Sequence, residues 1–187
     1  MSILPQVPTP AYPGRRWEAR QYPGTPSICS RFRAELRSDL RSLAGVPRRL
    51  RDDIELCASE AFANAVTHSR SQRAGGTVIR MLSTPIVMGP QTTLRLSVID
   101  DGPLGSRPMC PPARRSVEDW EQAESGRGLQ LIHRLANEWG TQRWADPDSL
   151  SVLGMVLWAE FTYPTLAAVP ALTTTDTSTS CVCGGTR

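Results

Sequence analysis

The chain has 187 residues, of which 40% are hydrophobic and 21% charged, a composition that suits one soluble domain with some excess at its ends. The formal net charge of +3 is too small to indicate a nucleic-acid partner, and no apolar run approaches the roughly 18 residues needed to span a membrane. Every basic residue is Arg, so a Walker-type phosphate loop and Schiff-base chemistry are excluded and any phosphate must be held by Arg and backbone N–H groups.

The N-terminal part of the sequence predicts a disordered arm, a strand and a helix. Residues 1–14 are rich in proline and are expected to form an extended, poorly ordered arm. Weak alternation over 15–22 indicates an edge strand. Thr25 followed by Pro26 predicts a helix start with Thr25 as the N-cap, and the helix is expected to continue to about Leu43. No leader of the secretory type opens the sequence, so we expect a cytoplasmic protein.

A second, longer helix is predicted over 47–69 from apolar residues that recur at spacings of three and four. Glu60, Asn64 and His68 are each four residues apart, so they line one edge of this helix beside its apolar stripe and should be partly buried. Polar groups in such a place need partners. From this helix alone, the simpler interpretation is that the row only caps or bridges neighbouring loops.

The pattern then changes to that of a sheet. Strands are predicted at 77–82 and 93–99, with a loop or hairpin connection at 85–91. The second strand alternates apolar and polar residues and runs directly into Asp100-Asp101-Gly102-Pro103. Residues 103–125 show little periodicity, and an irregular segment of this length is typical of a functional lid or of disorder.

A third helix is predicted to open at Ser125 and to end at 139–141. A short strand at 142–145 and a strongly apolar closing strand at 152–163 follow it. The Thr- and Ser-rich tail, 164–187, cannot bury much surface and is expected to be disordered. The predicted fold of residues 15–163 is therefore α+β, a two-layer sandwich in which three helices cover one face of a mixed sheet.

Three polar segments lie at the edges of these predicted elements. The start of the third helix carries Gly126-Arg127-Gly128, and a helix N-terminus with flanking glycines is a natural phosphate site. Asp100 ends a central strand, where it could accept a hydrogen bond from an exocyclic amine such as that of adenine. Asn64 offers an amide oxygen suited to Mg²⁺, and Glu60, one turn away, could orient or deprotonate an attacking hydroxyl.

The order and spacing of these segments resemble the GHKL ATPase superfamily, whose nucleotide-binding domain is called the Bergerat fold. The resemblance covers about residues 15–163. Ser59 to His68 is similar to the N box, Asp100-Asp101-Gly102-Pro103 to the first glycine box, Gly126-Arg127-Gly128-Leu129 to the second, and Gly154 with the strand after it to the last box. The small size of the chain matches the stand-alone anti-sigma-factor serine/threonine kinases best.

The resemblance implies a specific role for each matching residue. Asn64 would bind the Mg²⁺ that bridges the phosphates of ATP, and Glu60 would be the general base. Asp100 would accept a hydrogen bond from the adenine amine, with Gly102 beside the base. The remaining implied residues form the second glycine box, where backbone N–H groups would bind the phosphates: Gly126, Arg127, Gly128 and Leu129.

The resemblance also implies partners. Members of that branch phosphorylate a Ser or Thr of an anti-sigma-factor antagonist, otherwise sequester a sigma factor, and commonly work as homodimers. We therefore expect ATP and Mg²⁺ as cofactors and two protein partners, a sigma factor and an anti-sigma-factor antagonist. No direct nucleic-acid partner and no membrane partner are expected.

Two departures from the family pattern leave alternatives open. Met155 follows Gly154 where many relatives carry Lys or Thr, and Leu104 stands where the first glycine box has a second glycine. Both weaken the case for turnover more than the case for nucleotide binding. One alternative is a catalytically weak, nucleotide-dependent protein-binding module of the same fold, and another is an α+β domain without nucleotide. A histidine kinase is disfavoured because His68 lies within the N box and His133 within the third predicted helix.

Overall fold

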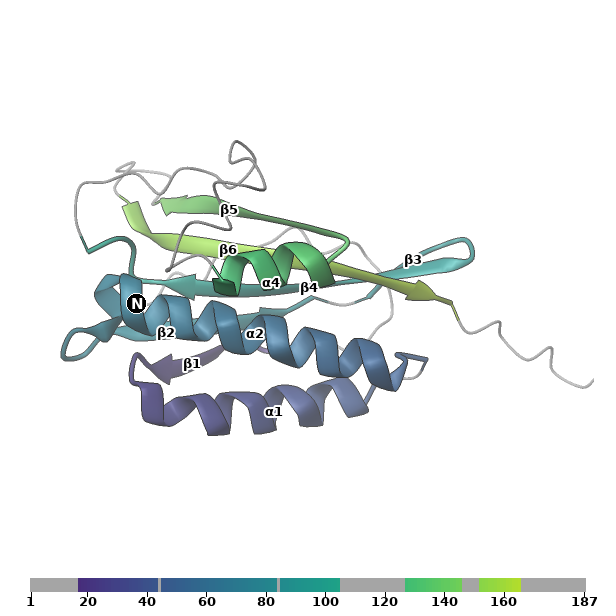
Figure 1. The fold of residues 1–187 in the computed structure, drawn as a ribbon, viewed down its shortest axis with the longest axis horizontal. Helices are drawn as coiled ribbons and strands as arrows, with labels where there is room; N and C mark the ends of the chain where they lie inside the picture. The colour runs from purple at the N-terminus through teal and green to yellow at the C-terminus, as the bar shows by residue number, and fades with distance from the viewer. Residues whose placement is uncertain (1–16, 44, 84, 105–126, 146–151, 166–187) are drawn as a thin grey trace, which may run out of the picture.

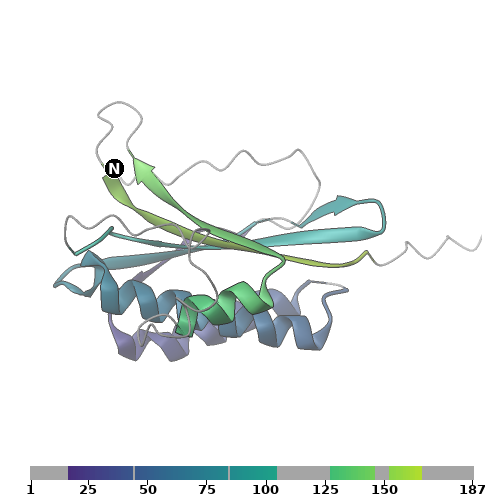
Figure 2. The ribbon, with the colours of Figure 1, turned by 45° about the horizontal axis from the view of Figure 1, so that its top comes forward.

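The computed structural model describes residues 17–43, 45–83, 85–104, 127–145 and 152–165. The predicted N-terminal arm, nearly all of the predicted lid and nearly all of the predicted tail lie outside these residues. The described part of the chain forms two layers, a twisted sheet and a set of helices that cover one of its faces (Figures 1 and 2). The predicted α+β sandwich is confirmed.

Element boundaries follow the predicted pattern closely in most places. The helices are α1 (Cys29–Arg41), α2 (Arg48–His68) and α4 (Arg127–Leu135), with short 3₁₀ turns η1 (Pro26–Ile28) and η2 (Arg70–Gln72). The strands are β1 (Arg20–Pro23), β2 (Thr77–Leu82), β3 (Ile86–Met88), β4 (Gln91–Asp100), β5 (Glu138–Ala145) and β6 (Val152–Pro164). None of the described helices is both long and apolar enough to cross a membrane.

The strand order is β1-β2-β4-β6-β5, and β3 forms a hairpin with β4 (Figure 1). The sequence predicted a mixed sheet, but each pairing between the described strands is antiparallel. The connection predicted at 85–91 as a loop or hairpin is a hairpin. Its turn is closed by Gly89, whose φ of +60° favours glycine.

Two local predictions need correction. Thr25 was expected to cap the first helix, but its side chain makes no capping hydrogen bond, and the chain enters α1 through the 3₁₀ turn η1 instead. Residues 139–141 were expected to end the third helix, yet they belong to β5, where Gly140 pairs with Trp158 of β6. A Cβ on Gly140 would lie 2.9 Å from the Trp158 indole, so this glycine makes room for a cross-strand ring rather than for a turn.

The main core lies between the sheet and the helices. Its centre is an aromatic group in which the Phe32 ring lies 5.1 Å from that of Tyr22 and 4.7 Å from that of Phe62, joining β1, α1 and α2. A smaller cluster around Ile79, Ile99 and Val156 lies on the opposite face of the sheet. The sheet therefore buries side chains on both faces.

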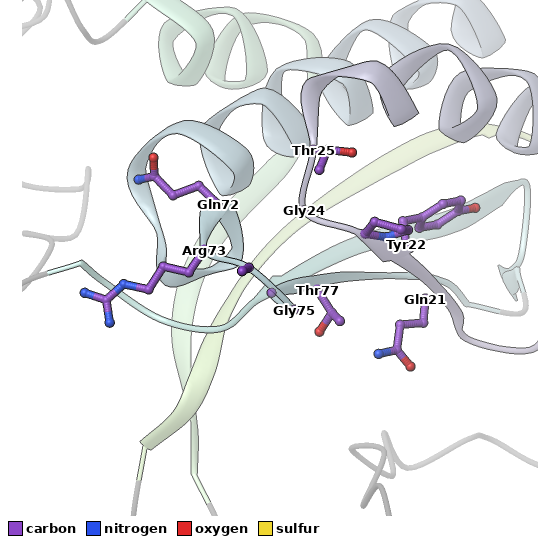
Figure 3. Close-up of a pocket in the computed structure, with 11 residues that line it drawn as sticks. Gln21, Tyr22, Gly24, Thr25, Gln72, Arg73, Gly75 and Thr77 are labelled. Atoms are coloured by element: carbon purple, nitrogen blue, oxygen red, sulfur yellow. The ribbon is translucent and has the colours of Figure 1, made fainter.

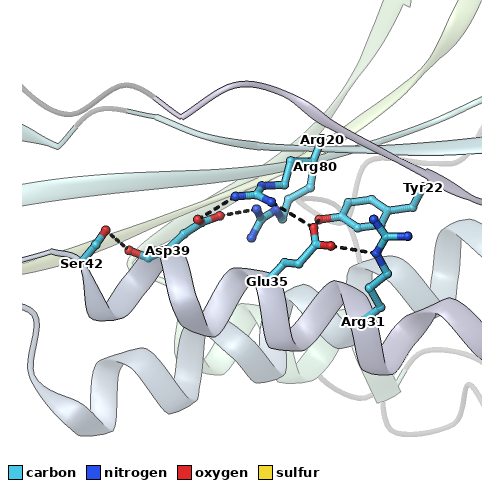
Figure 4. A network of polar contacts seen from close by, with 7 residues as sticks. All are labelled: Arg20, Tyr22, Arg31, Glu35, Asp39, Ser42 and Arg80. Carbon is cyan, nitrogen blue, oxygen red and sulfur yellow. Dashed lines mark hydrogen bonds and ion pairs between the residues drawn. The ribbon is translucent and has the colours of Figure 1, made fainter.

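A polar network fastens α1 to the edge of the sheet (Figure 4). Asp39 accepts hydrogen bonds from Arg80 of β2 and, at 3.0 Å, from Arg20 of β1, and Arg80 is only 1% exposed. Glu35, one turn before Asp39, accepts from the Tyr22 hydroxyl at 2.9 Å. Two of the guanidinium nitrogens of Arg80 have no hydrogen-bond partner among the described residues. The ion pair with Asp39 is therefore the main compensation for burying the charge of Arg80.

Candidate functional site

Glu60 and Asn64 of α2 lie against the first turn of α4. Gly128 is the point of contact: a Cβ added to it would lie 2.7 Å from Glu60 Oε2 and 3.6 Å from Asn64 Nδ2. A carbon cannot come so close to the carboxylate oxygen without displacing it. The two helices can therefore approach in this way because residue 128 is a glycine.

The start of α4 offers backbone donors at this contact. The helix begins at Arg127, so the N–H groups of its first turn have no partner within the helix and stand at the positive end of its dipole. The Arg127 side chain is exposed, whereas Leu129 is partly buried and packs against the main core, which holds the helix start in place. Gly126 lies outside the described residues.

The side-chain amide of Asn64 has a buried nitrogen at the contact with α4. Its Nδ2 is buried and has no hydrogen-bond partner among the described residues, a state that costs about 1–3 kcal/mol for a buried polar group. Because the O and N of an amide have nearly the same shape, a flip would place Oδ1 at the same point. Amide oxygen together with phosphate oxygens is a ligand set that suits Mg²⁺. The residues present therefore fit an Mg²⁺–triphosphate group, although the described part of the chain holds no cluster of three or more His, Cys, Asp and Glu side chains able to bind a metal.

His68 does not share this environment. It is the last residue of α2 and is exposed, whereas Glu60 and Asn64 are partly buried. The expected partial burial is wrong for His68, because residues four apart on a helix with 3.6 residues per turn drift steadily around its axis.

The two neighbouring aspartates at the end of β4 have different partners. Asp101 accepts hydrogen bonds from Thr77 through both carboxylate oxygens, at 2.7 Å from the backbone N–H and at 3.2 Å from the hydroxyl. Asp100 accepts hydrogen bonds from two backbone N–H groups, that of Gly102, at 2.6 Å through Oδ1, and that of Met155. A carboxylate has about four acceptor sites, so Asp100 retains capacity to accept a hydrogen bond from a ligand.

Asp100 lies on the helix-covered side of the sheet. In the antiparallel register it is opposite Val78 of β2 and Met155 of β6, and Val78 belongs to the main core. Residues directly opposite each other point to the same face, so the Asp100 carboxylate, the Met155 side chain and the start of α4 are on one side. Burial raises the pKa of Asp100 to about 6, and the nearby charge of Asp101 acts in the same direction.

Gly102 and Gly154 are required by their neighbours. Gly102 has a φ of +85°, and a Cβ on it would lie 3.0 Å from a terminal nitrogen of Arg70 and 3.6 Å from Gly154 Cα. A Cβ on Gly154 would lie 2.0 Å from the backbone oxygen of Asp100. The Arg70 guanidinium therefore borders the position where a Gly102 Cβ would stand and leaves little room for it.

The sequence did not single out the segment that holds this turn, which follows directly after α2. The Ser71 hydroxyl accepts a hydrogen bond from Asp101 N–H at 2.9 Å and donates to the Thr77 carbonyl at 2.6 Å. Ser69 forms an isolated bridge with Pro103. The only available signal was a cluster of short polar residues at a helix end, and this does not reveal a partner 30 residues away.

Both residues that depart from the family pattern lie near this turn. Met155 is partly buried beside Asp100, and Leu104 is 41% exposed at the last described position before residue 127. An apolar thioether in the place of an ammonium or hydroxyl group can contact a ligand but donates no hydrogen bond.

A separate pocket of ≈ 550 Å³ lies at the edge of the sheet, between β1 and the turn that leads into β2 (Figure 3). Gln21 and Tyr22 line one side, and Gln72 and Arg73 line the other. None of the site residues predicted from the sequence lines this pocket. The described residues that line it contain no buried side-chain atom without a hydrogen-bond partner of the kind found at Asn64, so the candidate functional site is the one at α2, α4 and the end of β4.

The fold and this site define a class of protein: a two-layer α+β domain of the ATPase type, in which a helix start, a neighbouring helix edge and a strand end converge on one side of the sheet. More specifically, the chain belongs to the histidine kinase-like ATPase domain family, whose model matches residues 22–157. Domains of this family bind ATP, usually with Mg²⁺. Comparison with curated proteins gives no match for this chain.

Proposed function

We propose that the protein binds ATP with Mg²⁺ at the junction of α2, α4 and the end of β4. The observation that carries this proposal is the close approach of Gly128 to Glu60 and Asn64. It places the backbone N–H groups of the first turn of α4 beside a buried amide nitrogen that has no hydrogen-bond partner among the described residues. Arg127, Gly128 and Leu129 donate backbone hydrogen bonds to phosphate oxygens, and Gly126 is assigned the same role. Asp100 accepts a hydrogen bond from the adenine amine.

The same arrangement supports phosphoryl transfer. When bound, Mg²⁺ neutralises phosphate charge. Asn64 holds its side-chain oxygen toward the metal, and Glu60, one turn earlier on the same helix edge, orients the attacking hydroxyl and accepts its proton. The contact with Gly128 keeps the Glu60 carboxylate close to the phosphate-binding turn.

An equilibrium binding measurement tests the nucleotide site. ATP with Mg²⁺ is expected to raise the unfolding midpoint of the chain, since a ligand at 100 times its Kd stabilises the native state by about 2.7 kcal/mol. Asn64→Ala should weaken the Mg²⁺-dependent binding at least about tenfold, the effect of one lost ligand group. Thr67→Ala, an exposed position on the same helix, is the matched control. No shift of the wild-type midpoint with ATP and Mg²⁺ would refute the proposal.

We further propose that the bound ATP serves a regulatory kinase. Its protein substrate is a Ser or Thr of an anti-sigma-factor antagonist, and its second partner is a sigma factor that it sequesters as a homodimer in the cytoplasm. Support comes from the family match and from the likeness of the boxes to those of the anti-sigma-factor kinases. Affinity capture with the chain in its native host, followed by mass spectrometry, tests this. Recovery of neither type of partner would argue against the circuit.

A second candidate function is a nucleotide-dependent binding module with weak catalysis. Met155 favours it, because this side chain stands directly opposite Asp100 and replaces a polar contact that many relatives have near the nucleotide. Retained ATP binding without phosphoryl transfer to any captured partner would support this candidate over the kinase.

The raised pKa of Asp100 predicts that nucleotide binding depends on pH. Because burial raises this pKa to about 6, the carboxyl group becomes protonated as the pH falls through 6 and then accepts a hydrogen bond less well. ATP affinity should therefore fall about tenfold from pH 7 to pH 5, which a titration followed by calorimetry would measure. Asp100→Asn is the control, since it retains the titration of the phosphates and loses that of residue 100.

The raised pKa of Asp100 also affects the stability of the unliganded protein, with the opposite dependence on pH. A carboxyl group whose pKa is higher in the folded than in the unfolded chain binds more protons when folded, so its contribution to stability falls as the pH rises from about 4 to about 6. Asp100→Asn should thus stabilise the unliganded chain at pH 7 while weakening ATP binding. Equal ATP affinity of wild type and variant at pH 7 would contradict the assigned role of Asp100.

A further inference from the structure

Arg70, the first residue of η2, makes two hydrogen bonds to the turn at the end of β4. Its backbone N–H donates to the Gly102 carbonyl at 2.8 Å, and its side-chain Nε donates to the Asp101 carbonyl at 2.7 Å. Both bonds join residues about 30 positions apart in the sequence. They hold two successive carbonyl groups of the turn, so they restrict its backbone on both sides of Gly102.

The rest of the guanidinium group lies over Gly102. A terminal nitrogen of Arg70 is 3.0 Å from the point where a Cβ of Gly102 would stand. The positive charge is near enough to the Asp100 carboxylate to favour its ionised form, against the larger opposing effect of burial. Arg70 is partly buried, and the geometry of its planar fork is one that Lys cannot reproduce.

The position of Arg70 in the chain links two parts of the site. It follows two residues after the end of α2, the helix that carries Asn64, and it holds the turn that carries Asp100. The neighbouring bridge between Ser69 and Pro103 joins the same two segments. By contrast, the start of α4 meets α2 at Gly128 without involving Arg70.

We propose that Arg70 is a positioning residue for base recognition: it fixes the Asp100–Gly102 turn so that the Asp100 carboxylate faces the exocyclic amine of a purine. This inference rests on the proposed nucleotide binding. Arg70 itself does not touch the nucleotide in this proposal. Its removal affects the contact with the base and leaves the phosphate contacts at α4 and Asn64 in place.

The test compares ATP with inosine triphosphate, which carries a carbonyl oxygen in place of the amine at position 6 of the base. Both ligands are titrated with Mg²⁺ into the full chain. The wild type should prefer ATP by at least about tenfold, because a site that accepts a hydrogen bond from an amine is left unsatisfied by the analogue. Arg70→Ala should weaken ATP binding about tenfold and inosine triphosphate binding by less than about twofold, so that the preference nearly disappears.

Three further variants make the result specific. Arg70→Lys should give an intermediate preference, because an ammonium group can donate to one carbonyl without the planar fork. Gly102→Ala changes the same contact from the side of the turn. Its Cβ would crowd the Arg70 guanidinium and its φ of +85° is strained for alanine, so it should also lower the preference. Arg73→Ala removes an exposed Arg from the end of the same loop and should leave the preference unchanged.

The outcomes distinguish a failure of the role proposed for Arg70 from a failure of the proposed nucleotide site. A purely structural role of Arg70 would lower the unfolding midpoint and weaken both ligands equally, and an unchanged preference in Arg70→Ala and Gly102→Ala would overturn the inference. If the wild type bound neither ligand, the proposed nucleotide site itself would be wrong. Loss of preference in both variants but not in Arg73→Ala is the expected result.

Discussion

Glu60→Gln is expected to lower phosphoryl transfer from ATP to the captured antagonist by about 10²–10⁴-fold, the usual contribution of a general base. Glu60 is partly buried, and its Oε2 lies beside the first turn of α4, where the phosphates of ATP are proposed to bind. Gln keeps the size of the side chain and its packing against Gly128 but cannot accept the proton. ATP affinity should therefore stay within about twofold of the wild type.

Transfer of label from γ-labelled ATP to the antagonist measures this effect, and Glu60→Ala should behave like Glu60→Gln. Glu55→Gln is the matched control: it lies on the same helix but pairs with Arg37 of α1, away from α4. Undiminished transfer by both Glu60 variants would refute the role of Glu60 as the base. Loss of ATP binding along with transfer would instead indicate that Glu60 contributes to the binding of the nucleotide.

Asp39→Ala is expected to destabilise the fold by about 3–5 kcal/mol, the cost of leaving a buried charge without its partner. Arg80 is only 1% exposed, and two of its nitrogens have no hydrogen-bond partner among the described residues. Asp39 also joins Arg20 of β1 to α1. The variant should lower the midpoint of urea unfolding strongly and leave the slope of the transition unchanged.

A double variant tests whether the loss of stability comes from the unpaired buried charge or from the loss of side-chain packing. In Asp39→Leu combined with Arg80→Met no buried ion remains, and such replacements of a buried pair are often neutral or stabilising. The double variant should therefore recover most of the stability lost by Asp39→Ala. Arg37→Ala, which removes an ion pair at the surface of α1, should change the midpoint little. A small effect of Asp39→Ala would show that water or movement of α1 relieves the charge of Arg80.

Local patterns in the sequence were sufficient to predict most helices and strands and to place the polar residues on them. Spacings of three and four predicted α2 nearly to the residue, and alternation predicted the central strand β4, because the core faces of a helix and a strand have different periods. The same periods put Glu60 and Asn64 on one helix edge and Asp100 at a strand end. The resemblance to the GHKL superfamily then indicated the family, which the match over residues 22–157 shows.

Only the tertiary structure shows which of these residues contact one another and which already accept hydrogen bonds from the protein. Asp101 accepts hydrogen bonds from Thr77, whereas Asp100 accepts from the backbone N–H groups of Gly102 and Met155. Gly102 was predicted to stand beside the base, and the structure shows that the Arg70 guanidinium borders the position where its Cβ would stand.

The physical reason is the range of the interactions. The periodicity of a helix or a strand is a property of neighbours in the chain, so it can be seen in the sequence. The contacts of Gly128 with Glu60, of Arg70 with Asp101 and of Thr77 with Asp101 join residues that are 24 or more positions apart. They exist only after the sheet and helices have packed. Periodicity alone therefore predicted the row of polar groups on α2, whereas its placement beside the second glycine box came only from the family resemblance.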